Sequence, residues 1–189
     1  MVSIKITQKN QNASYFISFT CHEWLPLIAI SSQYDAFSKW FYYLKDKHIP
    51  LLAYVIMPNH FHGILHVPDE SIININNIIA NGKRFIAYEI VKSLKAKGDI
   101  VTLSILNSSL SLNDRKKKQQ HKVFISSFDC KEILSDEMFF TKLDYIHFNA
   151  VRGKWNLAED YTKYPHSSAG FYELEEENEF LTHFSDVFG

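Results

Sequence analysis

The sequence contains few of the residues that mark disulfide-stabilised or membrane-spanning proteins. Only 2 of its 189 residues are cysteines, and Cys21 and Cys130 lie far apart without CxxC spacing, which argues against a disulfide framework or a cysteine-rich zinc site. The longest apolar runs, such as residues 25–30, are far too short to span a bilayer, and no charged-then-apolar leader opens the chain. We therefore expect a cytoplasmic protein with no membrane partner.

A strong net charge is also missing. The 20 lysines and arginines nearly balance the 21 aspartates and glutamates, giving a formal charge of −1, which argues against a strongly basic, histone-like binder. The charges are unevenly placed, because the stretch from Lys83 to Lys122 is basic whereas glutamates crowd into the last residues. A polyanion is expected to meet the middle of the chain.

Boundaries between domains are not visible either. The chain has no internal repeat and no linker rich in proline and glycine, so we expect a single domain over residues 1–189. Its core should cover about residues 13–172, and an acidic C-terminal tail should follow at about residues 173–189.

Apolar periodicity predicts both strands and helices. Three strands are expected, at Ala13–Cys21, Leu51–Met57 and His60–Val67, and the turn-forming pair Pro58-Asn59 joins the last two as a hairpin. One further strand is expected somewhere within Val123–Ile133.

Three helices are predicted by apolar residues at helical spacing, at Gln33–His48, at Ile72–Lys97 and from about Asp136 to Val151, where Ser135 is the expected N-cap. The polar run from Asn113 to Gln120 is expected to be an exposed, mobile loop. The order is thus βαββα, followed by a strand and a helix. This order favours a ferredoxin-like α+β fold, an antiparallel sheet with helices on one face and the other face free.

Two histidines share one face of the third predicted strand. Strand periodicity places His60, His62, Ile64 and His66 together, with Phe61 and its alternate neighbours toward the core. Adjacent imidazoles can bind one divalent cation. His66 lies farther along the strand and is expected to flank the site without being a ligand.

A tyrosine lies off the buried stripe of the last predicted helix. Lys142, Tyr145, Asn149 and Arg152 form a separate stripe from the apolar one. Such a stripe combines a nucleophile, an amide oxygen for a metal, and two cations for phosphate oxygens. This set suits phosphodiester transesterification, in which a phenolate attacks phosphorus beside a divalent cation.

Three segments resemble one protein family. Residues 54–66 (YVIMPNHFHGILH), residues 143–155 (LDYIHFNAVRGKW) and residues 160–172 (DYTKYPHSSAGFY) resemble, in the same order, the motifs of HUH single-tyrosine transposases, in particular the REP-associated tyrosine transposases. The resemblance implies a DNA strand transferase that cleaves and rejoins single-stranded, hairpin-containing DNA through a 5′-phosphotyrosine.

The resemblance also implies roles for individual residues. Tyr145 would be the nucleophile, and His60, His62 and Asn149 would bind Mg²⁺ or Mn²⁺. The sequence departs from the family at Ala150, where proline usually follows the asparagine. Alanine should let the helix continue through Arg152.

Basic residues outside these motifs are candidates for contact with a DNA backbone. Besides Lys142 and Arg152, these residues lie on one face of the long middle helix and in the polar run after it: Arg84, Lys92, Lys95, Arg115, Lys116, Lys117 and Lys118.

Two other functions are compatible with the sequence. A protein of the same ancestry can bind hairpin DNA or RNA without cutting it, and a metallohydrolase can use the histidine pair to activate water, which gives Tyr145 no role. The sequence leaves open whether the protein is a monomer or a homodimer.

Overall fold

A computed structural model describes residues 12–71 and 73–188. Its strands are β1 (Ala13–Thr20), β2 (Leu51–Ile56), β3 (His60–Val67) and β4 (Asp129–Ile133). The helices are α1 (Leu27–Ser31), α2 (Ala36–Asp46), α3 (Ile75–Ala96), α4 (Ile100–Ser108), α5 (Leu112–Lys116), α6 (Asp136–His147), α7 (Ala169–Glu173) and α8 (Ser185–Phe188), with short 3₁₀ helices η1 (His22–Trp24), η2 (Phe148–Val151) and η3 (Tyr161–Lys163). Within the described ranges, no helix combines the length and apolar character needed to cross a membrane.

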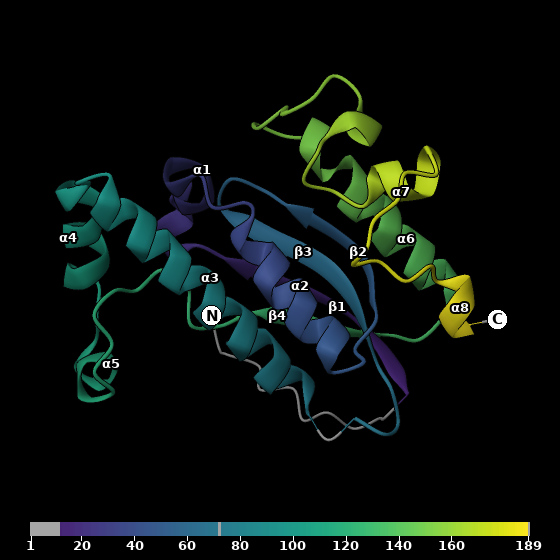
Figure 1. The fold of residues 1–189 in the computed structure, drawn as a ribbon, viewed down its shortest axis with the longest axis horizontal. Coiled ribbons are helices and arrows are strands. Elements are labelled where there is room, and N and C mark those ends of the chain that lie inside the picture. Colours follow the sequence, from purple (N-terminus) through teal and green to yellow (C-terminus); the bar gives the residue numbers. More distant parts are fainter. Residues whose placement is uncertain (1–11, 72, 189) are drawn as a thin grey trace.

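The four strands form one antiparallel sheet in the order β2-β3-β1-β4. This order and the helices packed on the sheet confirm the predicted α+β, ferredoxin-like class (Figure 1). The expected fourth strand is shorter than the predicted range, because Phe124 makes only an isolated bridge to Cys21 before β4 begins. The expected helix start at Ile72 lies outside the described residues.

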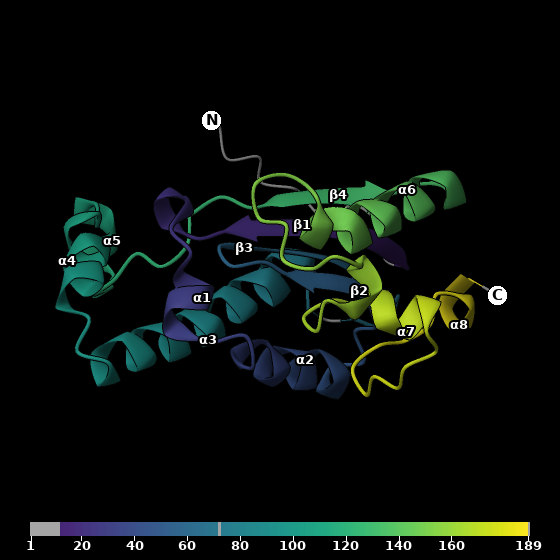
Figure 2. The same ribbon diagram turned by 90° about the horizontal axis from the view of Figure 1, so that it is seen from above.

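Helices α2 and α3 cover one face of the sheet, as Figure 2 shows. The predicted stripe of α3 is buried there, with Ile79, Ile86, Ile90 and Leu94 fully inside. The two helices approach closely at Gly82, where an added methyl group would meet the indole ring of Trp40.

This contact predicts the sign of a stability change. Replacing glycine by alanine inside a helix ordinarily stabilises it by up to about 1 kcal/mol. Gly82→Ala should instead lower the free energy of unfolding by about 1–3 kcal/mol, because the new methyl group overpacks against Trp40. Denaturant unfolding measures the difference, and a variant as stable as the wild type would contradict this packing.

The opposite face of the sheet is not free, which corrects the expectation of helices on one face only. Helix α6 packs there on a second apolar cluster, in which Phe16 and Ile64 of the sheet contact Leu143 and Ile146 of the helix. The strands carry large apolar residues on both faces, so a second layer is needed to bury them. The C-terminal segment adds Phe184 to this cluster.

Residues 98–120 are more helical than predicted. Asp99 caps α4 through a bond from the Thr102 backbone, and Ser111 forms a capping box with Asp114 at the start of α5. The expected loop at residues 113–120 therefore begins only after Lys116, because the capping box stabilises a helical turn in a polar sequence. Both helices project from the end of the molecule away from α6 (Figure 1).

The last predicted helix ends earlier than expected. Helix α6 begins after the N-cap Ser135, as predicted, but stops at His147 and tightens into η2, and Arg152 is extended. Ala150 is fully buried and its carbonyl accepts a bond from the Leu157 backbone, so the chain turns back at this point. The prediction that alanine carries the helix through Arg152 is wrong, because tertiary packing overrides helix propensity here.

Candidate active site

The two histidines of β3 lie side by side beneath α6. The ring centroids of His60 and His62 are 4.8 Å apart, and both rings are buried on the sheet face that α6 covers. The alternation of the strand therefore produces the predicted adjacency. His66, farther along the same face, is bonded instead to the Ser14 hydroxyl at 3.1 Å and to the Asn12 side chain at 3.2 Å.

Asn59 fixes the orientation of the first imidazole. Its side-chain nitrogen donates to the carbonyl oxygen of Trp24 at 2.9 Å, so its Oδ1 faces Nδ1 of His60 at 2.6 Å. An amide oxygen can only accept, so Nδ1 of His60 carries the proton and Nε2 keeps its lone pair. The sequence analysis used Asn59 only as a turn residue; its position directly before the histidine was the available signal.

Tyr145 of α6 reaches the histidine pair from above. Its Oη lies 3.4 Å from Nε2 of His62, and the two ring centroids are 5.1 Å apart. Tyr145 is 43% exposed, so a substrate can approach this residue, although the contact of its hydroxyl with His62 is partly buried. Phe16 of β1 stacks on His62 and meets the ring of Tyr145 edge-on, which fixes both rings.

The other predicted site residues separate into near and far groups. The Asn149 side chain hydrogen-bonds to His60, and Nζ of Lys142 lies 5.8 Å from the ring centroid of Tyr145. Arg152 follows η2 and packs over Phe148, with 4.7 Å between its guanidinium carbon and the ring centroid. It does not share the helical stripe with Tyr145, because α6 has already ended.

Lys154 is a cation near the site that the sequence analysis missed. Its charge acts on His60, and it is exposed two residues after Arg152. The signal available in the sequence was its place as the second lysine or arginine after the tyrosine, within the motif at residues 143–155. The positive charges around the site therefore come from both the helix and the loop that follows it.

Burial keeps both imidazoles neutral at physiological pH. Desolvation, offset in part by the bond to Asn149, lowers the pKa of His60 to about 4. Desolvation and the charges of His60 and Lys142 lower the pKa of His62 to about 3. Neutral imidazole is the form that binds metals.

The donor set is compatible with a divalent cation. Among the described residues, Nδ1 of His62 is buried without a hydrogen-bond partner, and buried polar atoms of this kind call for a ligand. No cluster of three or more His, Cys, Asp and Glu side chains occurs in the described part of the chain. A cation would therefore need the amide oxygen of Asn149 and oxygen atoms from outside the protein.

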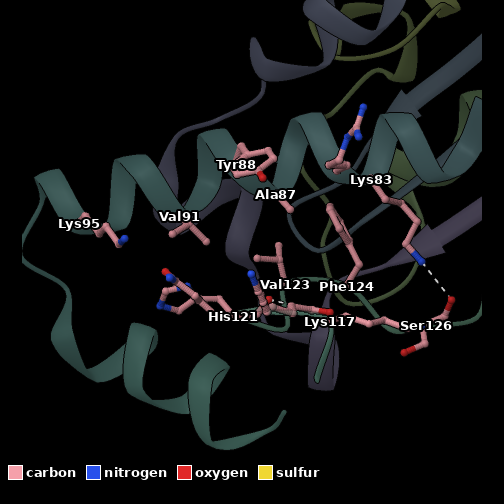
Figure 3. A pocket seen from close by; sticks show the side chains of 14 residues that line it. Lys83, Ala87, Tyr88, Val91, Lys95, Lys117, His121, Val123, Phe124 and Ser126 are labelled. Carbon is pink, nitrogen blue, oxygen red and sulfur yellow. Dashed lines mark hydrogen bonds between the residues drawn. The ribbon is translucent and has the colours of Figure 1, made fainter. Parts of the chain in front are cut away.

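Part of the predicted basic surface lines a separate groove, between α3 and residues 117–126 (Figure 3). Of the predicted DNA-binding residues, it brings together Arg84, Lys95, Lys117 and Lys118. Lys92 and Lys116 are exposed but do not line it, and Arg115 donates to the Asn107 carbonyl at 3.1 Å. These cations lie on the α3 side of the sheet, away from Tyr145.

Comparison with known proteins shows a likeness in structure. No family model and no curated protein matches the sequence. A solved structure described as a REP-associated tyrosine transposase bound to a REP hairpin is similar over 96% of this chain and 94% of its own, with a TM-score of 0.58 and 16% identity. A candidate transposase from Deinococcus radiodurans R1 gives a TM-score of 0.42 and 12% identity, over 75% of this chain and 94% of its own. The chain therefore has the fold of the first of these two proteins.

Proposed function

We propose that this protein is a single-tyrosine DNA strand transferase of the transposase type, which cleaves and rejoins single-stranded, hairpin-containing DNA. The observation that carries the proposal is the position of the Tyr145 hydroxyl, which lies 3.4 Å from a buried, neutral His62 on a residue that is 43% exposed. The shared fold supports it, since the solved structure with that fold is of a tyrosine transposase with a REP hairpin.

The chain's own residues would bind and cut one strand as follows. Lys142, whose charge acts on His62, and Lys154, whose charge acts on His60, supply positive charge for the phosphate oxygens. Oη of Tyr145 attacks phosphorus and forms a phosphotyrosine, while the bond from phosphorus to the 3′ oxygen breaks. The phenol loses a proton and the leaving 3′ oxygen gains one. Because one phosphoester bond replaces another, a 3′ hydroxyl can reverse the step and join strands without ATP.

The residues assigned to a cation are His60, His62 and Asn149. A divalent ion held there, Mg²⁺ or Mn²⁺, would polarise the scissile phosphate and stabilise the charge of the transition state. Asn59 orients His60 through the 2.6 Å bond to Nδ1, which directs the lone pair of Nε2 away from Asn59.

The test is a covalent adduct. We expect the protein, incubated with Mn²⁺ and single-stranded oligonucleotides copied from imperfect palindromes beside its gene, to become attached to a 5′ phosphate and to release a free 3′ hydroxyl. Denaturing gels detect the adduct and mass spectrometry locates it on Tyr145.

The outcome separates the proposal from its two rivals. Cleavage without an adduct would indicate that water is the nucleophile, as in a metallohydrolase. Tight binding of the same oligonucleotides without cleavage would indicate a binding protein. An adduct on Tyr161 or Tyr164 would show that a different side chain attacks, and each of these results would overturn the role of Tyr145.

A further inference from the structure

The groove between α3 and residues 117–126 is a second site, separate from Tyr145. It encloses about 640 Å³, within the range of about 300–1,000 Å³ that small-ligand sites occupy. Helix α3 covers the sheet face opposite to α6, so the groove and the histidine pair lie on different faces of the sheet. The proposed strand transfer at Tyr145 does not use this groove, although four of the predicted DNA-binding residues line it.

The rim of the groove is positively charged. Arg84 and Lys95 project from α3, and Lys117 and Lys118 come from the facing segment, as Figure 3 shows in part. Among the described residues that line it, none is an aspartate or glutamate. An anion in the groove would therefore meet cations from both walls and no carboxylate.

The acids nearest in sequence have partners of their own. Glu89 of α3 is paired with Lys39 at 2.8 Å. Asp114 is bonded to Ser111 in its capping box, and these bonds, with a smaller effect of the charges of Lys122 and Lys117, lower the pKa of its carboxyl group. Asp114 therefore offsets part of the positive field near Lys117, while it lies outside the lining of the groove.

The floor of the groove is apolar and carries an exposed aromatic ring. Ala87, Val91, Val123 and Phe124 line it. Tyr88, which also lines the groove, is 70% exposed. A bare tyrosine ring over an apolar floor offers a stacking surface for a planar, unpaired base.

The wall opposite α3 is held in place by the rest of the fold. Nζ of Lys83 is buried and donates to the carbonyl oxygen of Ile125 at 2.6 Å. The Lys122 backbone donates to the Leu106 carbonyl at 2.9 Å, and Phe124 bridges to Cys21. The groove is thus formed before a ligand arrives, which reduces the entropic cost of binding.

His121 is part of this wall. Burial and the charge of Lys95 lower its pKa, which is consistent with Lys95 facing it across the groove in Figure 3. The fold gives it a place beside a cation and an exposed polar rim.

We propose that this groove binds unpaired nucleotides of a nucleic-acid strand. Tyr88 stacks on a base, while Lys95, Lys117 and Lys118 contact phosphates of the same strand. A duplex buries the faces of its bases in the stack, so it cannot use the tyrosine ring in this way. The proposal depends on the proposed function only for the choice of DNA as the strand.

The groove lies at the same end of the sheet as the histidine pair. Thr20 of β1 pairs with His60 on one side, and its carbonyl accepts a bond from the Ile125 backbone on the other. The end of strand β1 therefore lies between the two sites. The groove would hold a single-stranded flank while the cleavage point lies at Tyr145.

Binding measurements in a Tyr145→Phe background test the groove without cleavage. Fluorescence anisotropy with a labelled oligothymidylate should show that Tyr88→Ala weakens binding by about 5- to 100-fold, as loss of one stacked base does. Tyr88→Phe keeps the ring and should bind like the parent. Binding of a blunt duplex should be unaffected by either change.

The role of the lysine charges is tested by comparing lysines that line the groove with neighbouring lysines that do not. Lys95→Gln and Lys117→Gln should each reduce the slope of log affinity against log salt by about 0.7, the value for one single-strand phosphate contact. Lys92→Gln on the same helix and Lys116→Gln beside Lys117 lie outside the groove, and they should change the slope much less. All these side chains are exposed, and thermal unfolding checks that the fold is intact.

Three results would overturn the groove as a site: wild-type affinity in Tyr88→Ala, an equal loss for the duplex, or equal salt slopes inside and outside the groove. These outcomes are distinct from a failure of the strand-transfer proposal. A missing adduct with intact Tyr88 dependence would leave the groove standing. A Tyr145 adduct with no effect of Tyr88→Ala on binding would remove the groove alone.

Discussion

Tyr145→Phe should abolish covalent attachment to DNA and lower strand cleavage by at least about 10³-fold, as removal of a catalytic nucleophile does in other enzymes. Only one oxygen atom is removed. The ring keeps its packing against Phe16 and His62, so the fold and the affinity for DNA should stay within about twofold of the wild type.

Two measurements are needed together for this variant. Anisotropy with the uncleaved oligonucleotide reports binding, and a denaturing gel of the same mixture reports the adduct. Tyr161→Phe is the matched control, since this tyrosine belongs to η3 and packs on Phe148 at 4.2 Å between centroids. Residual cleavage of Tyr145→Phe above the stated limit would mean that another oxygen is the nucleophile.

His60→Ala and His62→Ala should each weaken Mn²⁺ binding by at least about 100-fold, because loss of an outer-shell partner alone typically costs about 10–100-fold. Cleavage should be lost with the metal. Isothermal titration with Mn²⁺ measures affinity directly and does not depend on activity. The same titration is repeated with His62→Gln, which keeps a polar side chain in the buried position. A loss of Mn²⁺ affinity in this variant is not explained by misfolding alone.

His66→Ala is the control that the strand itself provides. His66 lies on the same face of β3 but is bonded to Ser14 and Asn12, so its loss should leave Mn²⁺ affinity within about twofold of the wild type if the assignment is correct. The Mn²⁺ affinity of Asn59→Ala should lie between these cases, about 10–100-fold below that of the wild type, because the substitution removes the partner that fixes the proton of His60 on Nδ1. Wild-type affinity in both His60→Ala and His62→Ala would eliminate the metal site.

The local geometry of the candidate site can be predicted from the sequence alone. A strand repeat of two residues requires His60 and His62 to project from one face. A helix repeat of 3.6 residues separates Tyr145 from the buried stripe of Leu143 and Ile146. Both features depend on a few neighbouring residues, so they can be read without knowledge of the rest of the chain.

The hairpin and the class of the sheet were also accessible from the sequence. The hairpin at Pro58-Asn59 joins β2 to β3, and the βαββα order of elements favours the observed arrangement of the sheet. Boundaries were less accurate, because they depend on caps and packing. The capping box of Ser111 turned part of a predicted loop into α5, and the burial of Ala150 ended the last helix early.

The contacts between distant side chains, by contrast, depend on tertiary packing. Helix α6 covers the histidine face because apolar side chains such as Phe16 and Ile64 need a second layer there, and this packing puts the Tyr145 hydroxyl 3.4 Å from His62 across 83 residues of chain. Tertiary packing also decides which side chains of the basic run line the groove. Lys117 lines it, whereas its neighbour Lys116 does not. Contacts of this kind depend on the register and packing of distant segments, and no local pattern of residues encodes them.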